Sequence, residues 1–258
     1  MWVEKSAKTS VKIMMNGDVT NSALVSEHVV NTFLSLAGES YKVLVEHDVK
    51  IPIGCGFGSS GAGALSLALA LNEAFNLNLP RLEAAQMAHI AEVKCKTGLG
   101  TVIAETFGGL EIRTKSGAPG VGKTKSIPVS SSYVIACLNF GPIPTMEILT
   151  DEAFRRRINR FGGNLVDELA KHPTLDNFMG FSRKFAEHLG VISKRLRAVL
   201  EETDSAGLTC STAMLGETVF SLVKRDQVKE VHEIFSKHAP SERSVIMAEV
   251  DFKGARLL

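Results

Sequence analysis

The spacing of hydrophobic residues in the first half of the chain predicts strands and helices around a glycine-rich turn. Short apolar runs with alternation indicate strands, and apolar residues that recur about every 3.6 positions indicate helices. A turn at Asn16-Gly17-Asp18 follows the first predicted strand, and the glycine-rich segment Pro52–Gly61 precedes the second predicted helix. The predicted strands are Val11–Met15 and Tyr41–Glu46, and the predicted helices are Ser22–Leu36, Ala62–Phe75 and a segment from Pro80 to about Val93.

The pattern of the second half predicts helices packed on an antiparallel sheet. Leu110–Thr114 and Ser126–Val129 have the pattern of hairpin arms, and the continuous apolar run Tyr133–Phe140 is typical of a buried strand. The remaining predicted elements are two or three helices within Leu149–Leu200, a strand at Thr218–Val223, a helix at Gln227–Lys237 and a strand at Ser244–Phe252. This succession predicts an α+β fold.

The composition is that of a globular protein with balanced charge. The chain has 258 residues, 45% of them hydrophobic, and 29 basic residues stand against 28 acidic ones. Disorder is excluded, and charge gives no indication of nucleic-acid or membrane binding. The longest apolar run, Ala62–Leu71, is shorter than the roughly 20 residues of a membrane span. Four cysteines without disulfide or zinc spacing, and no signal peptide, predict reduced thiols and a cytoplasmic location.

One glycine-rich segment has the letters of a nucleotide-binding P-loop. Gly117–Thr124 satisfies G-x-x-x-x-G-K-[ST], but a P-loop must open a helix so that its amides converge on phosphates. Pro128 and a run of serines follow instead, and they cannot continue a helix. We therefore expect an exposed hairpin loop, and a P-loop nucleoside triphosphatase in which Lys123 binds the phosphates is the alternative.

The segment Gly56-x-Gly58-x-x-Gly61 has the letters of a dinucleotide fingerprint. A dinucleotide fold needs a second parallel strand about 20 residues further on, whereas the next predicted element is a helix. The segment still has the feature that the P-loop and the dinucleotide fingerprint share, a glycine turn at the start of a helix. There, amide groups and the hydroxyls of Ser59 and Ser60 can bind an anion. The alternative is a turn that only caps a packed helix.

The residues around this turn resemble a known superfamily. Pro52–Leu65 is similar to the signature P-x-x-x-G-[LF]-G-S-S-[AG]-A of the GHMP kinases, which include galactokinase, homoserine kinase and mevalonate kinase, and looks most like the branch that acts on pantoate. The resemblance implies a two-lobed fold, with a lobe like domain 2 of ribosomal protein S5 at residues 1–130 and a ferredoxin-like lobe at 131–258. It also implies a kinase that uses ATP and Mg²⁺ on a small hydroxy acid or alcohol.

The resemblance also implies roles for single residues. The expected nucleotide-binding residues are Gly54, Gly56, Phe57, Gly58, Ser59, Ser60 and Gly61. Ser60 and Glu92 are expected to hold Mg²⁺, although Glu92 could equally lie on a solvated helix face. Thr101 and Lys94 are expected at the catalytic position, and Gly98, Gly100 and Arg155 near the substrate. The arginine run at 155–157 could instead be a solvated helix face.

This chain departs from the superfamily pattern in three places. Many GHMP kinases carry a catalytic aspartate seven residues before a Gly-Gly pair, and that position here is Thr101, which cannot act as a general base. The usual N-terminal strand block precedes the point at which this chain enters the pattern, so a bare sheet edge and a homodimer are expected. The third glycine motif is thin, with Ser205–Ser211 in its place as a phosphate-side wall or merely a turn. An inactive relative that only binds nucleotide is the alternative to an enzyme.

Overall fold

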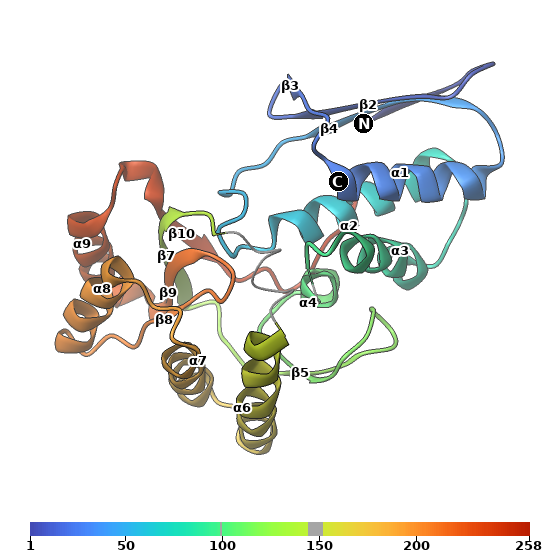
Figure 1. The fold of residues 1–258 in the computed structure, drawn as a ribbon. Helices are drawn as coiled ribbons and strands as arrows, with labels where there is room; N and C mark the ends of the chain where they lie inside the picture. The colour runs from blue at the N-terminus through green and yellow to red at the C-terminus, as the bar shows by residue number, and fades with distance from the viewer. Residues whose placement is uncertain (99, 144–151) are drawn as a thin grey trace.

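The first lobe is built on a four-stranded sheet (Figure 1), and the computed structural model describes residues 1–98, 100–143 and 152–258. The strand order is β1-β4-β2-β3. β2 and β4 are parallel because helix α1 crosses between them, whereas β1 and β3 are antiparallel to their neighbours. The strands are β1 (Trp2–Lys5), β2 (Ser10–Met15), β3 (Asp18–Val19) and β4 (Tyr41–His47).

Strand β1 is an element that the hydrophobic pattern did not predict. Its four residues are too few for a clear alternation, yet it pairs with β4 so that Trp2 lies opposite Leu44 and Lys5 opposite Tyr41. The outer side of β4 is therefore covered by backbone pairing. The bare edge expected in the N-terminal sheet is therefore not found at β4, because this short N-terminal segment pairs with it.

Three helices cover one face of this sheet and form the larger core. They are α1 (Leu24–Ala37), α2 (Ser59–Ala74) and α3 (Arg81–Cys95). Helix α2 is rich in alanine and leucine because α1, α3 and the short helix α4 (Thr101–Phe107) all contact it. Phe33 of α1 and Leu65 and Leu71 of α2 are fully buried in this core. The predicted strands and helices of this half are confirmed, with α2 beginning three residues before the predicted start at Ala62.

The second lobe is an antiparallel sheet with two helices on it. The strand order is β10-β7-β9-β8, and Val199, Leu200 and Phe235 fill the core between this sheet and helices α8 and α9. The elements are β7 (Tyr133–Gly141), α8 (Lys194–Ser205), β8 (Ser211–Thr212), β9 (Glu217–Lys224), α9 (Val228–His238) and β10 (Val245–Glu249), with short 3-10 turns at Arg225–Gln227 and Glu242–Ser244. This succession matches the β-α-β-β-α-β pattern of ferredoxin-like folds.

A hairpin and two further helices lie between the lobes (Figure 1). The hairpin consists of β5 (Glu111–Lys115) and β6 (Lys123–Ser126), and the helices are α6 (Glu152–Lys171) and α7 (Leu175–Leu189). Ile112, Ile127 and Leu169 form the small core that joins the hairpin to these helices. Three helices thus occupy the segment for which two or three were predicted, while Pro144 and Leu149 lie outside the described residues.

The C-terminal segment returns to the first lobe. The amide of Ala255 donates to the carbonyl of Glu105 at 2.8 Å, and the amide of Gly109 donates to the carbonyl of Asp251 at 2.7 Å. A side chain at Gly108 would overlap this segment, which explains the Gly-Gly pair. In the described parts of the chain, no helix is both long and apolar enough to cross a membrane.

Candidate active site

The glycine-rich loop between β4 and α2 has the backbone that the sequence predicted. Gly54, Gly56 and Gly58 have φ angles of +75°, +86° and +74°, which residues with a side chain rarely adopt. Gly58 is the N-cap of α2, and no side chain caps the helix there. The first amides of α2 therefore lack an intrahelical partner and carry the positive end of the helix dipole. The loop is not buried under apolar side chains, since Gly56 is exposed and Ser60 is half-buried.

The second lobe holds this loop from the other side. The hydroxyl of Thr218, at the start of β9, donates to the carbonyl of Cys55 at 2.7 Å. A side-chain carbon at Gly56 would lie 2.6 Å from the Cβ of Ala213, and one at Gly216 would overlap the Cys55 carbonyl. The segment from Ala213 to Gly216 is therefore the wall beside the loop. The phosphate-side reading of Ser205–Ser211 was wrong, because its first residues form the C-terminal turn of α8.

Glu92 and Ser60 meet beside the loop, as the resemblance implied. Glu92 is only 1% exposed on α3, and its Oε1 accepts hydrogen bonds from the hydroxyls of Ser60 and Thr97, the latter at 2.6 Å. Gly98 packs so closely against Oε2 of Glu92 that no side chain would fit. A buried carboxylate next to a hydroxyl is a donor set of hard oxygens that suits Mg²⁺. The reading of Glu92 as a solvated helix face is wrong.

Helix α4 places two side chains against the first turn of α2. Thr101 and Glu105 are one helical turn apart and therefore lie on the same face. A side-chain carbon at Gly58 would lie 2.5 Å from Cγ2 of Thr101 and 2.7 Å from Oε1 of Glu105. Thr101 is thus at the loop, as expected. Glu105 was missed, although its spacing from Thr101 along a helix could have indicated it.

A second cluster of polar side chains lies near Glu92 and consists of Arg113, Glu111 and His89. The guanidinium of Arg113, on β5, lies against Gly100 and pairs with Glu111 at 3.2 Å. Nε of Arg113, Oε2 of Glu111 and Nδ1 of His89 are buried without a hydrogen-bond partner. Burial, with the nearby charge of Arg113, lowers the pKa of His89, so its imidazole is held neutral. Arg113 was not predicted from the sequence, because only the fold brings this residue of β5 close to His89 of α3.

Two predicted residues do not join this cluster. Lys94 is exposed on α3, two residues after Glu92, and residues two apart on a helix point in different directions. Arg155 is exposed near the start of α6, in the part of the chain that packs on the hairpin. Neither side chain has a described contact with the glycine loop, so the catalytic role for Lys94 and the substrate role for Arg155 gain no support.

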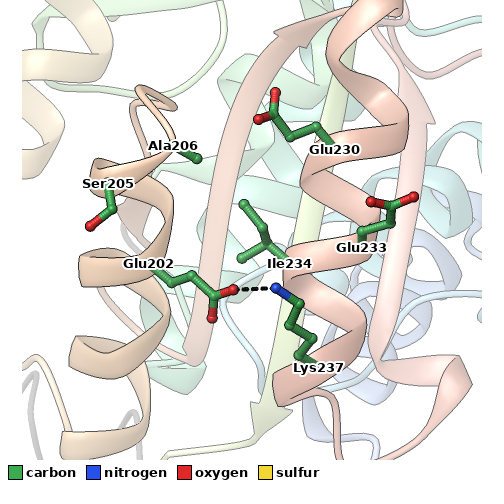
Figure 2. Close-up of a pocket in the computed structure, with 7 residues that line it drawn as sticks. All are labelled: Glu202, Ser205, Ala206, Glu230, Glu233, Ile234 and Lys237. Atoms are coloured by element: carbon green, nitrogen blue, oxygen red, sulfur yellow. Dashed lines mark hydrogen bonds and ion pairs between the residues drawn. The ribbon is translucent and has the colours of Figure 1, made fainter.

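The larger described cavity lies elsewhere, between α8 and α9 (Figure 2), with a volume of about 370 Å³. Its lining is mostly polar and acidic, and Lys237 pairs with Glu202 across it at 2.6 Å. A second cavity of about 280 Å³ lies beside β2 and α1. Within the described residues, no group of three His, Cys, Asp or Glu side chains could hold a metal ion. The glycine loop, with Ser60 and Glu92, therefore remains the candidate active site.

Comparison with known proteins identifies the family of the chain. Residues 23–109 match the N-terminal domain of the GHMP kinases. The chain is 37% identical over 196 residues to the pantoate kinase of Methanocaldococcus jannaschii, covering 76% of this chain and 70% of the relative. It is 33% identical over 234 residues to the pantoate kinase of Methanospirillum hungatei, covering 90% and 78%. For the pantoate kinase of Thermococcus kodakarensis the identity is 37%, with 72% and 61% covered.

Solved structures show the same fold. A protein described as a phosphotransferase related to the CoA biosynthesis pathway superposes with a TM-score of 0.84 and 29% identity, covering 99% of this chain and 83% of that one. Homoserine kinase from Cytophaga hutchinsonii superposes with a TM-score of 0.67 and 16% identity, covering 98% and 86%. The two-lobed α+β chain therefore belongs to the GHMP kinase superfamily. Within the superfamily, its curated relatives named above are all pantoate kinases.

Proposed function

We propose that this protein transfers a phosphoryl group from ATP to a hydroxyl of pantoate, giving 4-phosphopantoate for coenzyme A synthesis. The observation that carries the proposal is the open glycine loop at the uncapped start of α2, with Ser60 and Glu92 beside it. The acceptor is taken from the pantoate kinases to which the chain is 33–37% identical. No short motif of this chain names the acceptor by itself.

The roles of the loop residues follow from their donors and acceptors. The amides from Gly56 to Gly61 are free to bind phosphate oxygens, and the helix dipole of α2 favours the negative charge. The hydroxyl of Ser60 and the carboxylate of Glu92 would hold Mg²⁺. When bound, Mg²⁺ neutralises charge on the phosphates during transfer. Thr97 keeps the Glu92 carboxylate in place through its hydrogen bond to Oε1.

The test is ADP release by the purified protein with pantoate, homoserine and mevalonate in separate assays. We expect kcat/KM with pantoate to be at least about tenfold higher than with homoserine or mevalonate. Tenfold corresponds to a difference of about 1.4 kcal/mol in the activation free energy. Nucleotide binding without turnover on any acceptor would support the inactive relative instead.

A pair of variants separates this proposal from the P-loop alternative. Lys123 lies at the start of strand β6, exposed, rather than at the start of a helix. We therefore expect Lys123→Ala to leave ATP affinity unchanged and Ser60→Ala to reduce activity. The opposite result would support the P-loop.

The homodimer and the cytoplasmic location remain predictions. Size-exclusion chromatography with light scattering would test the homodimer.

A further inference from the structure

Glu105 is the one carboxylate described at the glycine loop that has no partner. Its Oε2 is buried and makes no hydrogen bond, in contrast to the Glu92 carboxylate, which accepts two. A side-chain carbon at Gly61 would lie 2.8 Å from Oε2 of Glu105, so the carboxylate lies against the first turn of α2. A side-chain carbon at Gly58 or Gly61 would come within 3 Å of the Glu105 carboxylate, which would have to shift.

Such an arrangement is costly for a purely structural residue. Burying a polar group without a hydrogen bond is unfavourable, and burying a charged one without a partner is more so. Glu105 does not cap α2, because no side chain does, and no described cation pairs with it. Burial, reinforced by the charge of Glu92, raises the pKa of Glu105 to about 8. Oε2 of Glu105 therefore has an open hydrogen-bonding position that a ligand can fill, and its carboxyl group can exchange a proton near neutral pH.

The location of Glu105 indicates which group of a ligand can fill this open position. It shares a face of α4 with Thr101, and both side chains contact the turn whose amides are free to bind phosphates. A group held beside those phosphates would present its hydroxyl to this face. Thr101 can offer only a hydroxyl there, whereas Glu105 offers a hydrogen-bond acceptor that can also take a proton.

We propose that Glu105 is a catalytic residue that accepts the hydrogen bond of the acceptor hydroxyl and takes its proton during phosphoryl transfer. The hydroxyl oxygen forms a bond to the γ-phosphorus of ATP, the bond from that phosphorus to the ADP oxygen breaks, and the hydroxyl proton passes to Glu105 and then to water. This inference rests on the proposed function, because the hydroxyl belongs to the acceptor.

The test compares wild type, Glu105→Gln and the double variant Thr101→Asp/Glu105→Gln in steady-state assays with pantoate. We expect Glu105→Gln to lower kcat by about 10²–10⁴-fold, the usual contribution of acid–base catalysis, with KM for ATP changed less than about threefold. Thermal stability should not fall, because the amide is close in size and uncharged. The double variant restores a carboxylate one turn away on the same face, and we expect it to regain at least about tenfold in kcat.

A matched control is Glu73→Gln, which changes an exposed glutamate near the far end of α2 and should leave kcat unchanged. The inference is overturned if Glu105→Gln keeps kcat within about threefold of wild type, or if kcat and ATP affinity fall together. An inactive wild type with pantoate would contradict the proposed function instead, and that result is obtained before any variant is compared.

Discussion

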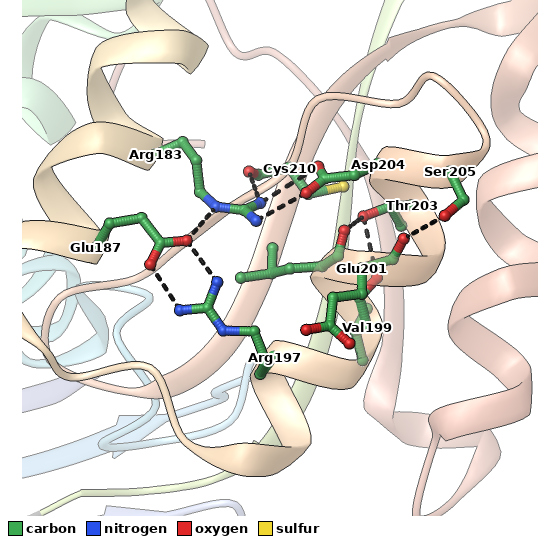
Figure 3. A network of polar contacts seen from close by, with 10 residues as sticks. Arg183, Glu187, Arg197, Val199, Glu201, Thr203, Asp204, Ser205 and Cys210 are labelled. Atoms are coloured by element: carbon green, nitrogen blue, oxygen red, sulfur yellow. Dashed lines mark hydrogen bonds and ion pairs between the residues drawn. The ribbon is translucent and has the colours of Figure 1, made fainter.

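Two polar networks of the molecule have opposite character. In the network between α7 and α8, Arg183 binds Glu187 at 3.0 Å, Asp204 at 2.9 Å and the carbonyl of Cys210 at 3.0 Å (Figure 3). Arg197 binds the same Glu187 through two hydrogen bonds of 2.6 Å. These charges are paired, and they tie α7 to α8 and to the segment before β8.

The network around the glycine loop is incomplete by comparison. Glu92 is satisfied, but Glu105, Glu111, Arg113 and His89 each have a buried atom without a partner. Buried polar atoms in folded proteins are nearly always hydrogen-bonded, so a group of exceptions needs a reason. The charged groups between α7 and α8 are therefore paired and hold elements together, whereas charged groups beside the glycine loop keep unpaired atoms at the place where a ligand is expected. Two buried hydroxyls of the second lobe, those of Ser211 and Thr212 in β8, also lack a partner, so the contrast concerns the charged groups.

The largest effect should come from a change at Glu92, the carboxylate beside the glycine loop that has hydrogen-bond partners. We expect Glu92→Gln to lower kcat/KM about 1,000-fold, because a bound metal contributes several kcal/mol to transition-state stabilisation. The expected signature is a higher Mg²⁺ requirement in steady-state assays across a magnesium series. Activity that stays within tenfold of wild type at every magnesium concentration would remove Glu92 from the metal site.

The next effect tests the contact between the lobes. In Gly216→Ala, the added carbon would overlap the Cys55 carbonyl, so the glycine loop must move. We expect about a 100-fold rise in KM for ATP, and overpacking typically costs about 1–3 kcal/mol in the free energy of unfolding. Gly163→Ala is the control, because this exposed glycine in α6 has nothing within 4 Å and the change should be neutral or stabilising. If Gly216→Ala and Gly163→Ala have the same KM for ATP and the same stability, the segment from Ala213 to Gly216 does not support the glycine loop.

A third effect should appear in stability alone. We expect Arg183→Ala to lower the free energy of unfolding by about 2 kcal/mol, because a half-exposed Asp204 and the Cys210 carbonyl lose their donor. Urea unfolding measures this, with Arg156→Ala as control. Arg156 forms only an exposed pair with Glu152, so its loss should cost less than about 0.5 kcal/mol. A large loss of kcat in Arg183→Ala at unchanged stability would contradict the structural role.

The smallest effect is the pH dependence of stability, which should have opposite signs in the two networks. The hydrogen bonds from Arg197, with those from Arg183, lower the pKa of Glu187 from 4.5 to about 2. Its contribution is therefore present above pH 4.5 and is lost as the pH falls towards 2. Burial raises the pKa of Glu105 from 4.5 to about 8, so its contribution is lost as the pH rises through that range.

Urea unfolding between pH 3 and pH 9 measures both pH dependences. We expect each carboxylate to change the free energy of unfolding by about 1 kcal/mol after solvent screening. Glu187→Gln should flatten the acid side of the stability curve, and Glu105→Gln should flatten the alkaline side. If Glu105→Gln leaves the alkaline side unchanged, the carboxylate titrates in its ordinary range.

Much of the fold could be predicted from local patterns. The helices α1, α2, α3 and α9 and the strands β2, β4, β7 and β9 have clear periodicities, and all were predicted. Strands β1, β3 and β8 were missed because four or two residues carry too little pattern, and β6 lies at Lys123–Ser126 rather than at the predicted Ser126–Val129. The P-loop letters were correctly set aside, since Gly117–Thr124 leads into β6 rather than into a helix.

The sequence by itself indicated the glycine loop, because positive φ angles and a close backbone approach favour glycine. The resemblance to the GHMP kinases also pointed to Ser60 within the loop motif and to Glu92 on the later helix α3. Only the tertiary structure placed Gly216, Thr218, Arg113 and Glu105 at the site, and among the described contacts it shows none between the loop and Lys94 or Arg155. Those positions depend on which distant elements pack together, and packing is a property of the whole core rather than of any local spacing.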